Sequence, residues 1–451
     1  MKNRSDIVVI GGGITGLCIA YLAAKSGKTV TVLESGDRFG GLLDTFEVGG
    51  THLEKFYHHF FLQDRELHWL LSELNLADKA VYRESKMGVY SGGKIYNFST
   101  LKDLFSFSPL SLLDKVRFGI TSFFLATFYN WKRHENQAAY AWLKSWSGKN
   151  VTRTIWGPLL RIKFGNYFSK VPLAWMIGRL GQRLKSRNGG KEMLGYLDGS
   201  LKVLCDKLIL SLESLEVKLH NLTPATELIY KNGVVCGVVA GQNRFEAETV
   251  ISTVPNQIIA ALTNPIDTDL ATELKKVEYF GAVCTVLELS KPLSNVYWLN
   301  MADTDFPFGG VIEQTNLLNP ERYNDIHIAY LSRYFAKDEI IATMSEDDLK
   351  KIMLDGVRRA FPDFDEKNLL NVHVFRTNTA ATVCDLNFSA KVNNCKSKIE
   401  GLVIANMIHV YPDERSVNNA IRVAANVCQS LGMDCSYIPR GNSLAGKIGF
   451  D

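Results

Sequence analysis

Residues 6–41 read DIVVIGGGITGLCIAYLAAKSGKTVTVLESGDRFGG, and this stretch decides the fold. It begins with a short β-branched run, 6–10, of the kind that forms a buried parallel strand. The segment 17–26 is rich in Ala and Leu and predicts a helix. A second β-branched run, 28–33, predicts another strand. Together these segments predict one complete βαβ unit.

The turn between the first strand and the helix fits the pattern G-x-G-x-x-G. Gly11 allows a tight turn, Gly13 lets a phosphate approach the backbone, and Gly16 lets the helix pack closely on the sheet. Ile14 and Thr15 lie at the helix N-terminus, where free N–H groups and the positive end of the dipole attract anions. The pattern predicts a dinucleotide site. The alternative is a glycine-rich turn in another kind of α/β protein.

An acidic residue ends the second predicted strand. Glu34 follows Gly16 by 18 residues, where a carboxylate bonds a ribose hydroxyl. Such a charge-assisted hydrogen bond contributes about 1.5–3 kcal/mol. A carboxylate at this position also repels a 2′-phosphate, which argues against NADP.

The residues after Glu34 extend the motif to E-x-x-x-R-x-G-G. This pattern resembles the extended fingerprint of the amine oxidase superfamily of flavoproteins. Segments 156–165, WGPLLRIKFG, and 109–115, PLSLLDK, resemble in particular its protoporphyrinogen oxidase-like and phytoene desaturase-like branch. The resemblance implies that the cofactor is FAD and that the second glycine pair lies against it. It implies cofactor contacts at Ser35, Arg38, Gly40, Gly41 and Leu42.

Later segments resemble the same superfamily. The segment 223–228, TPATEL, resembles the strand whose small residue, here Ala225, lies against the adenine. Segments 401–406, GLVIAN, and 415–421, RSVNNAI, resemble the final flavin-binding strand, loop and helix, which implies contacts at Asn406, Arg415 and Asn418. Arg415 is expected to lie beside the flavin or to face an anionic group of the substrate. A salt bridge on the protein surface is the alternative. The last helix region has no cysteine at the position that monoamine oxidases use for covalent flavin, so the resemblance implies non-covalent FAD.

The order of the predicted elements implies a discontinuous α/β fold. A Rossmann-like FAD-binding domain is assembled from residues 1–75, 191–265 and 386–451. The substrate domain combines a helical insertion, 76–190, with a mixed β-sheet, 266–385. We expect the active site between the two domains, where small-molecule sites are common.

Three of the nine histidines fall within residues 49–61, GGTHLEKFYHHFF. A histidine near flavin can donate or accept a proton, so His58 is the candidate catalytic residue. A purely structural role for His58 and His59 is equally compatible with the pattern. A metal site with His52 and Glu54 is a third alternative, and no metal is predicted.

Basic residues at four-residue spacing form a second candidate site. Arg179, Arg183 and Arg187 share one face of a predicted helix. A solvated face is the simpler interpretation. The alternative is a patch for an anionic substrate or for lipid.

Composition limits the partners. The chain has 451 residues, a net charge of +4 and 22% charged residues, with no basic stripe interleaved with aromatics. It is therefore typical of a globular enzyme with a small-molecule substrate and no nucleic-acid partner. The eight cysteines are scattered without a C-x-x-C pair, which indicates a cytoplasmic protein.

The most apolar segment is 101–131, and charged residues interrupt it. No run reaches the length that a membrane span needs. The favoured interpretation is a helical subdomain packed on the protein's own core. Peripheral contact with the inner membrane face is the alternative.

The resemblance implies an FAD-dependent oxidoreductase in which an organic substrate gives a hydride to flavin N5. The alternative is a flavin-dependent sugar-nucleotide mutase, similar to UDP-galactopyranose mutase, without net redox. A cofactor-binding protein without turnover is the third hypothesis.

Overall fold

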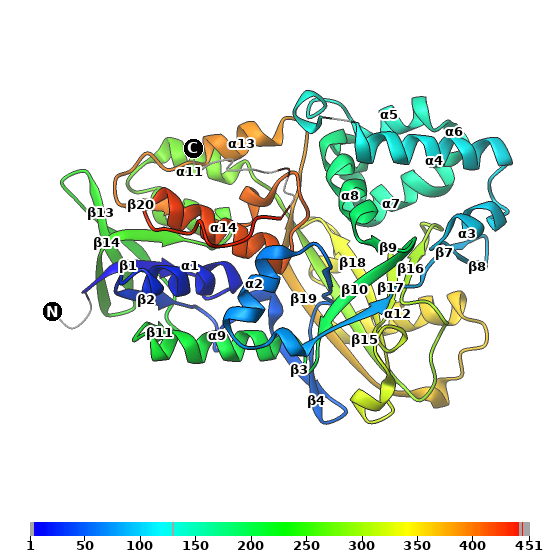
Figure 1. Ribbon diagram of the computed structural model, residues 1–451, viewed down its shortest axis with the longest axis horizontal. Helices are drawn as coiled ribbons and strands as arrows, with labels where there is room; N and C mark the ends of the chain where they lie inside the picture. Colours follow the sequence, from blue (N-terminus) through cyan, green and yellow to red (C-terminus); the bar gives the residue numbers. More distant parts are fainter. Residues whose placement is uncertain (1–3, 129, 442–443, 445–451) are drawn as a thin grey trace.

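The computed structural model describes residues 4–128, 130–441 and 444, and two seven-stranded sheets dominate it (Figure 1). The first sheet has the order β11-β2-β1-β14-β13-β12, with β20 paired to β14. Its strands are β1 Arg4–Ile10, β2 Val30–Leu33, β11 Lys218–His220, β12 Glu227–Lys231, β13 Val234–Ala240, β14 Asn243–Ser252 and β20 Leu402–Ile404.

The predicted βαβ unit forms the centre of the first sheet. β1 runs parallel to β2, and helix α1 (Ile14–Lys25) connects them. Val8 and Val9 point to opposite faces of β1 and are both fully buried, as expected for a strand covered on both faces. β1 also runs parallel to β14, so segments some 240 residues apart lie side by side.

Helices cover both faces of the first sheet. On one face, α1 packs beside α9 (Lys202–Ser214) and α14 (Val417–Ser430), and α14 also contacts α2 (Arg65–Glu73). The other face is covered by α10 (Asn256–Thr263), α11 (Thr268–Lys275) and α13 (Phe388–Asn394). This is the layered arrangement typical of Rossmann-like folds.

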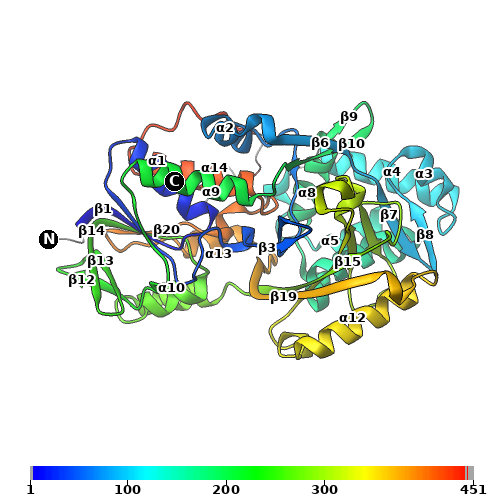
Figure 2. The same ribbon diagram turned by 90° about the horizontal axis from the view of Figure 1, so that it is seen from below.

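The second sheet is mixed and has the order β19-β15-β18-β17-β16-β7-β8. Its strands are β7 Met87–Ser91, β8 Lys94–Asn97, β15 Tyr279–Leu289, β16 Trp298–Met301, β17 Gly310–Glu313, β18 His327–Phe335 and β19 Leu369–Thr382. Helix α12 (Glu346–Ala360) packs on one face of this sheet (Figure 2). The opposite face contributes to a cavity.

Short strands and a hairpin lie between the two sheets. β10 (Lys191–Leu197) pairs with β5 (Phe60–Phe61) and β6 (Ala80–Glu84). β9 (Arg187–Asn188) pairs with the start of β10. Strands β3 (Thr45–Val48) and β4 (Thr51–Glu54) form the hairpin.

The predicted helical insertion starts later than expected. Residues 80–97 form β6, β7 and β8, so the expectation of helix is wrong for this part. The helices that follow are α3 Leu101–Ser106, α4 Leu112–Thr127, α5 Ala139–Trp146, α6 Lys149–Val151, α7 Gly157–Phe164 and α8 Leu173–Lys185. The domain boundaries remain a prediction, and residues 1–3, 129, 442–443 and 445–451 of the predicted segments lie outside the described residues.

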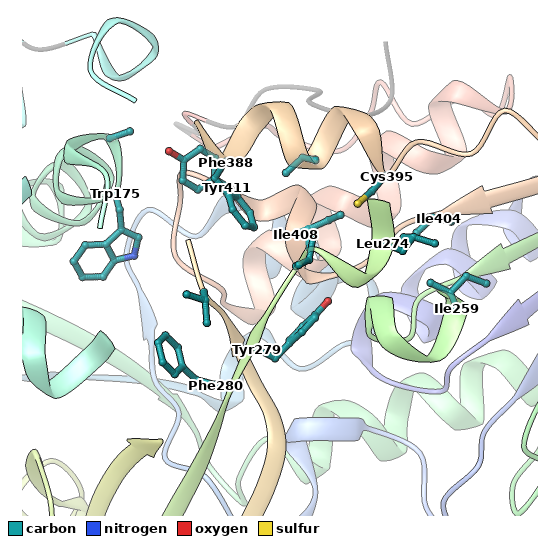
Figure 3. Close-up of a cluster of buried hydrophobic side chains, with 14 of the residues drawn as sticks. Trp175, Ile259, Leu274, Tyr279, Phe280, Phe388, Cys395, Ile404, Ile408 and Tyr411 are labelled. Carbon is teal, nitrogen blue, oxygen red and sulfur yellow. The ribbon is translucent and has the colours of Figure 1, made fainter. Parts of the chain in front are cut away.

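A buried apolar cluster joins the two parts of the molecule (Figure 3). Ile259 and Leu274 enter it from α10 and α11, whereas Tyr279 and Phe280 enter from β15. Trp175 of α8 packs into the same cluster. The shared core holds the first sheet, the second sheet and the helical region in one arrangement, and the cavity lies where they meet.

Candidate active site

A cavity of about 890 Å³ runs between the first sheet, the second sheet and the helical region. This volume is at the upper end of the range for ligand pockets. The wall includes most of the predicted site residues: Gly11, Gly13, Ile14, Thr15, Glu34, Ser35, Gly40, Gly41, Leu42, His58, Ala225, Asn406 and Arg415. Gly16, Arg38 and Asn418 are outside the wall.

The first glycine turn opens onto the cavity. Gly11 has φ +107°, which favours glycine. A Cβ atom on Gly13 would meet no protein atom within 4 Å, so this backbone is open toward the cavity. A Cβ on Gly16 would lie 2.0 Å from the Gly11 carbonyl oxygen, which is the close helix–strand approach that the sequence predicts.

Helix α1 begins at this opening without a side-chain cap. Gly13 is its N-cap residue and forms no side-chain hydrogen bond to the first turn. The first N–H groups of a helix have no partner within the helix. The N-terminus of α1 therefore presents donors and a positive dipole end to the cavity, as a pyrophosphate requires.

Glu34 lies at the end of β2 with its carboxylate held by backbone donors. The Gly12 N–H donates to Oε2 at 2.7 Å, and the Gly36 N–H donates to Oε1 at 2.7 Å. A carboxylate has about four lone-pair sites, so capacity remains for ribose hydroxyls. The position and the fixed orientation of Glu34 fit the predicted contact.

The second glycine pair lies against the first turn. The Gly40 N–H donates to the Gly12 carbonyl oxygen at 2.8 Å, and Gly40 and Gly41 have φ +118° and +61°. Arg38 instead points outward with a side chain 60% exposed, and it pairs with Asp44 at 3.4 Å. Its side chain contributes no contact to the cavity.

The two predicted asparagines of the C-terminal elements form hydrogen bonds within the protein. The Asn406 amide donates to Val254 O and to Asn256 Oδ1, both at 2.8 Å, so this side chain fixes the turn after β20. Asn418 is buried away from the cavity. It accepts from the Leu67 N–H at 2.9 Å and donates to Glu66 at 3.0 Å, so its side chain joins α14 to α2.

The two adjacent histidines have different partners. His58 Nδ1 donates to the Phe56 carbonyl oxygen, because a carbonyl can only accept, which leaves a lone pair on Nε2. His59 Nδ1 lies 3.2 Å from the Tyr297 hydroxyl. Exclusion of water lowers the pKa of His58 to about 4 and that of His59 to about 3. Both rings are therefore neutral at pH 7.

His52 lies on β4, outside the cavity wall. Within residues 4–128, 130–441 and 444, no three His, Cys, Asp or Glu side chains are grouped so that they could hold a metal ion.

We expect His59→Gln to make folding less sensitive to acid. The pKa of His59 is lower in the folded protein, about 3, than the ordinary value of 6.5. Below pH 6.5 the unfolded chain therefore binds a proton that the folded chain does not, and stability falls with pH. Each pH unit from 6.5 toward 3 costs the wild type about 1.4 kcal/mol relative to the variant.

Urea unfolding at several pH values checks this expectation. Gln keeps a polar group beside Tyr297, and His134→Gln on the exposed side of the molecule is the matched control. Parallel pH curves for the wild type and His59→Gln would contradict the assignment of a neutral His59.

Charged residues that the sequence did not bring together form a cluster in the cavity wall. Glu414 pairs with Lys163 of α7 at 3.2 Å and with Arg179 of α8. Although burial alone would raise it, Arg179 and Lys163 hold the pKa of Glu414 well below its usual range. The carboxylate is therefore charged at every working pH, and one anion faces two cations.

Arg415 adds a third cation to this cluster. It donates to the Tyr334 hydroxyl of β18, and its guanidinium lies 5.3 Å from the Tyr334 ring centroid. No acidic side chain among the described residues forms an ion pair with Arg415. Within the described part of the chain Arg415 therefore faces Tyr334 in the cavity wall, and its role stays a prediction.

The arginines of α8 are not a solvated face. Arg179 is 8% exposed, and Arg179 and Arg183 both line the cavity. Arg183 pairs with Glu192 at 2.9 Å, whereas Arg187 begins β9 and lies outside the wall.

Aromatic side chains from several elements complete the wall. Tyr57 packs edge-on against Trp298 with ring centroids 5.1 Å apart, and Tyr334 and Trp175 face the same space. The cavity thus has two different ends. One is lined by glycines and by the N-terminus of α1, which favours anions, and the other is lined by aromatic and cationic side chains. Such a shape fits a dinucleotide together with a second, smaller molecule.

Comparison with known proteins agrees with this arrangement. The family model described as flavin containing amine oxidoreductase matches residues 14–386. A coproporphyrinogen III oxidase of Mycobacterium tuberculosis is 26% identical over 289 residues, which is 59% of this chain and 62% of that protein. Amine oxidase B of Homo sapiens is 35% identical over 106 residues, or 22% of this chain and 19% of that protein.

Solved structures share the fold at low sequence identity. A putative protoporphyrinogen oxidase from Exiguobacterium sp. 255-15 has a TM-score of 0.77 at 15% identity and covers 96% of this chain and 99% of that one. The cyclohexylamine oxidase from Brevibacterium oxydans IH-35A has a TM-score of 0.70 at 14% identity, with 95% and 99% covered. The chain therefore belongs to the flavin-containing amine oxidoreductase family.

Proposed function

We propose that the protein oxidises an organic substrate that carries anionic groups. The observation that supports this proposal is the excess of positive charge at the aromatic end of the cavity. Lys163, Arg179 and Arg415 face this space, and Glu414 is the acidic partner of the first two. Charge-assisted hydrogen bonds from such cations bind carboxylates or phosphates well.

The same charges disfavour a cationic substrate. An ammonium group would meet three cations in an enclosed site, where charges are screened less than in water. Glu414 is already paired on both sides, so it offers little to a further cation. An amine substrate is therefore less compatible with this cavity than a carboxylate or a phosphate.

The cofactor sets where the substrate must lie. When bound, FAD accepts a hydride at its flavin ring. The N-terminus of α1 and Glu34 are proposed to hold the dinucleotide part, and the turn 406–410 together with the start of α14 is proposed to face the ring. Tyr57, Trp298 and Tyr334 then orient an unsaturated substrate body and exclude water.

His58 is proposed to take up the proton that the substrate loses as its hydride leaves. Its Nε2 lone pair is fixed by the Phe56 contact at Nδ1. With a pKa of about 4, His58 is neutral before the reaction, and the imidazolium that forms when Nε2 accepts the proton readily releases it again. The variant His58→Gln tests this role in proton uptake. If His58 accepts the proton, the variant reduces the flavin more slowly than the wild type.

Coproporphyrinogen III is the first probe, because a coproporphyrinogen III oxidase is among the relatives and this compound carries several carboxylates. The FAD-loaded protein is mixed anaerobically with coproporphyrinogen III, putrescine or a UDP-sugar. Bleaching of the flavin by the carboxylate compound and not by putrescine supports the proposal. Bleaching by putrescine alone overturns it.

The cationic cluster also suits the diphosphate of a nucleotide sugar, which keeps the mutase as a second candidate. A mutase would leave oxidised flavin unbleached and would isomerise UDP-galactopyranose only after external reduction. Product formation without consumption of electrons would favour this second function.

A further inference from the structure

One end of the molecule exposes an unusual number of large apolar side chains. They are between 44% and 76% exposed and come from α3, α4 and the residue after α4. We call them the apolar face: Leu101, Phe105, Leu112, Leu113, Val116, Ile120, Phe123, Phe124 and Phe128. Single exposed apolar residues are normal on a protein surface, but this many on two helices that contact each other indicate an interaction site.

Helix α4 shows the pattern most clearly. At about 100° per residue, its exposed apolar positions cover an arc of about 120°. The opposite side packs inward through the buried Thr121 and Leu125, and Phe118 contacts the Trp156 ring with centroids 4.9 Å apart. The core thus accounts for one side of α4, and the apolar side chains on the other side stay exposed among the described residues.

Positive charge is concentrated in the segments that carry and follow the apolar face. Residues 101–153 carry eight Lys or Arg and three Asp or Glu, whereas the whole chain has a net charge of +4. The remaining residues are therefore close to neutral. Seven of the eight cations are exposed and have no ion-pair partner among the described residues: Lys102, Arg117, Lys132, Arg133, Lys144, Lys149 and Arg153.

The position of this region suits contact with a large flat partner. Figures 1 and 2 both show α3 and α4 at the end of the molecule opposite β13 and β14. On the inner side, α4 packs against α8, whose Arg179 and Arg183 line the cavity. A partner at the apolar face would leave the first sheet free.

We propose that the apolar face docks onto the surface of a lipid bilayer that contains anionic lipids. An amphipathic helix with exposed Phe and Leu flanked by Lys and Arg lies in the plane of the lipid headgroups and inserts its apolar side chains. Each cation near an anionic membrane adds to the attraction. The longest such helix here is α4, and none of the helices in the described residues has the length and apolarity to cross a membrane.

A second copy of the chain fits the same face less well. A two-fold symmetric contact would bring the same patch of both copies together. The unpaired cations around the two apolar faces would then repel one another, whereas an anionic lipid surface neutralises them. The charge distribution therefore favours lipid over self-association.

Flotation with lipid vesicles tests the proposal. Full-length FAD-loaded protein is mixed with vesicles of phosphatidylcholine and phosphatidylglycerol or of phosphatidylcholine alone, then separated on a density gradient. We expect the wild type to float with the anionic vesicles and the double variant Phe123→Ser/Phe124→Ser to lose at least about tenfold in binding. Arg117→Gln/Lys149→Gln should weaken binding to anionic vesicles only.

The matched control is Ile340→Ser/Leu370→Ser, which changes two side chains that are 77% and 54% exposed elsewhere on the surface. It should float like the wild type, and all variants should keep their flavin absorbance and melting temperature. A wild type that stays at the bottom of the gradient, or a Phe variant that floats equally well, would overturn the proposal. Self-association that the Phe variant abolishes, without flotation, would assign the face to a second copy instead.

Discussion

Gly13→Val is expected to give a folded protein that no longer retains FAD. Gly13 has φ −72° and ψ 173°, which valine adopts readily, and its Cβ would meet no protein atom within 4 Å. The added side chain would instead occupy the cavity at the N-terminus of α1, where the pyrophosphate is proposed to bind. Loss of two or more charge-assisted hydrogen bonds lowers affinity by about 100-fold or more.

The ratio of flavin absorbance to protein after desalting measures this effect. Circular dichroism and the melting temperature report whether the fold persists. Gly119→Val is the matched control, since its Cβ also meets no protein atom and it lies on α4, away from the cavity wall. Full FAD retention by Gly13→Val would contradict the placement of the cofactor.

Gly16→Val should behave differently from Gly13→Val. Its Cβ would lie 2.0 Å from the Gly11 carbonyl oxygen, so the helix must move away from the strand. We expect misfolding rather than a stable apo-protein. The two glycines of one motif thus separate a ligand contact from a packing contact.

The βαβ unit could be predicted from sequence because its determinants are local. The β-branched runs, the glycines and Glu34 all fall within 36 consecutive residues, and each acts on its immediate neighbours. The second glycine pair, Gly40 and Gly41, follows shortly after Glu34 in the chain. Here the periodicity, the turn chemistry and the fold agree.

Strands β6, β7 and β8 were missed because their partners are distant. β7 pairs with β16, some 210 residues later, and β6 pairs with β10, more than 100 residues later. The short segments MGVYS and KIYN alternate apolar and polar residues only weakly, so the surrounding Leu- and Phe-rich sequence dominated the prediction. Pairing with a sheet overrides such weak local preferences.

The spacing of residues along the sequence also could not reveal the charged cluster in the cavity wall. Glu414 is 251 residues from Lys163 and 235 from Arg179, and only the fold brings them together. Conversely, Asn418 lies in a segment that resembles the flavin-binding helix, yet its side chain points to α2. A helix motif fixes which residues are near the cofactor, but the side-chain directions follow from the neighbouring helices.

Arg415→Gln is expected to weaken the binding of an anionic substrate by about 10- to 100-fold. The guanidinium has no acidic partner in the described part of the chain, so a substrate carboxylate is its proposed counter-ion. One charge-assisted hydrogen bond contributes about 1.5–3 kcal/mol, which corresponds to this range. The dependence of the anaerobic flavin-reduction rate on coproporphyrinogen III concentration gives the apparent Kd.

Two further variants separate the remaining roles of Arg415. Arg415→Lys keeps the charge and should recover part of the affinity, whereas Arg333→Gln changes a neighbour of Tyr334 that lies outside the cavity wall and should have no effect. If Arg415 holds the flavin instead, Arg415→Gln loses FAD on desalting and the apparent Kd of the FAD-loaded fraction stays unchanged. A weaker Kd at full FAD content would assign Arg415 to the substrate, because a residue that contacts only the cofactor cannot produce that combination.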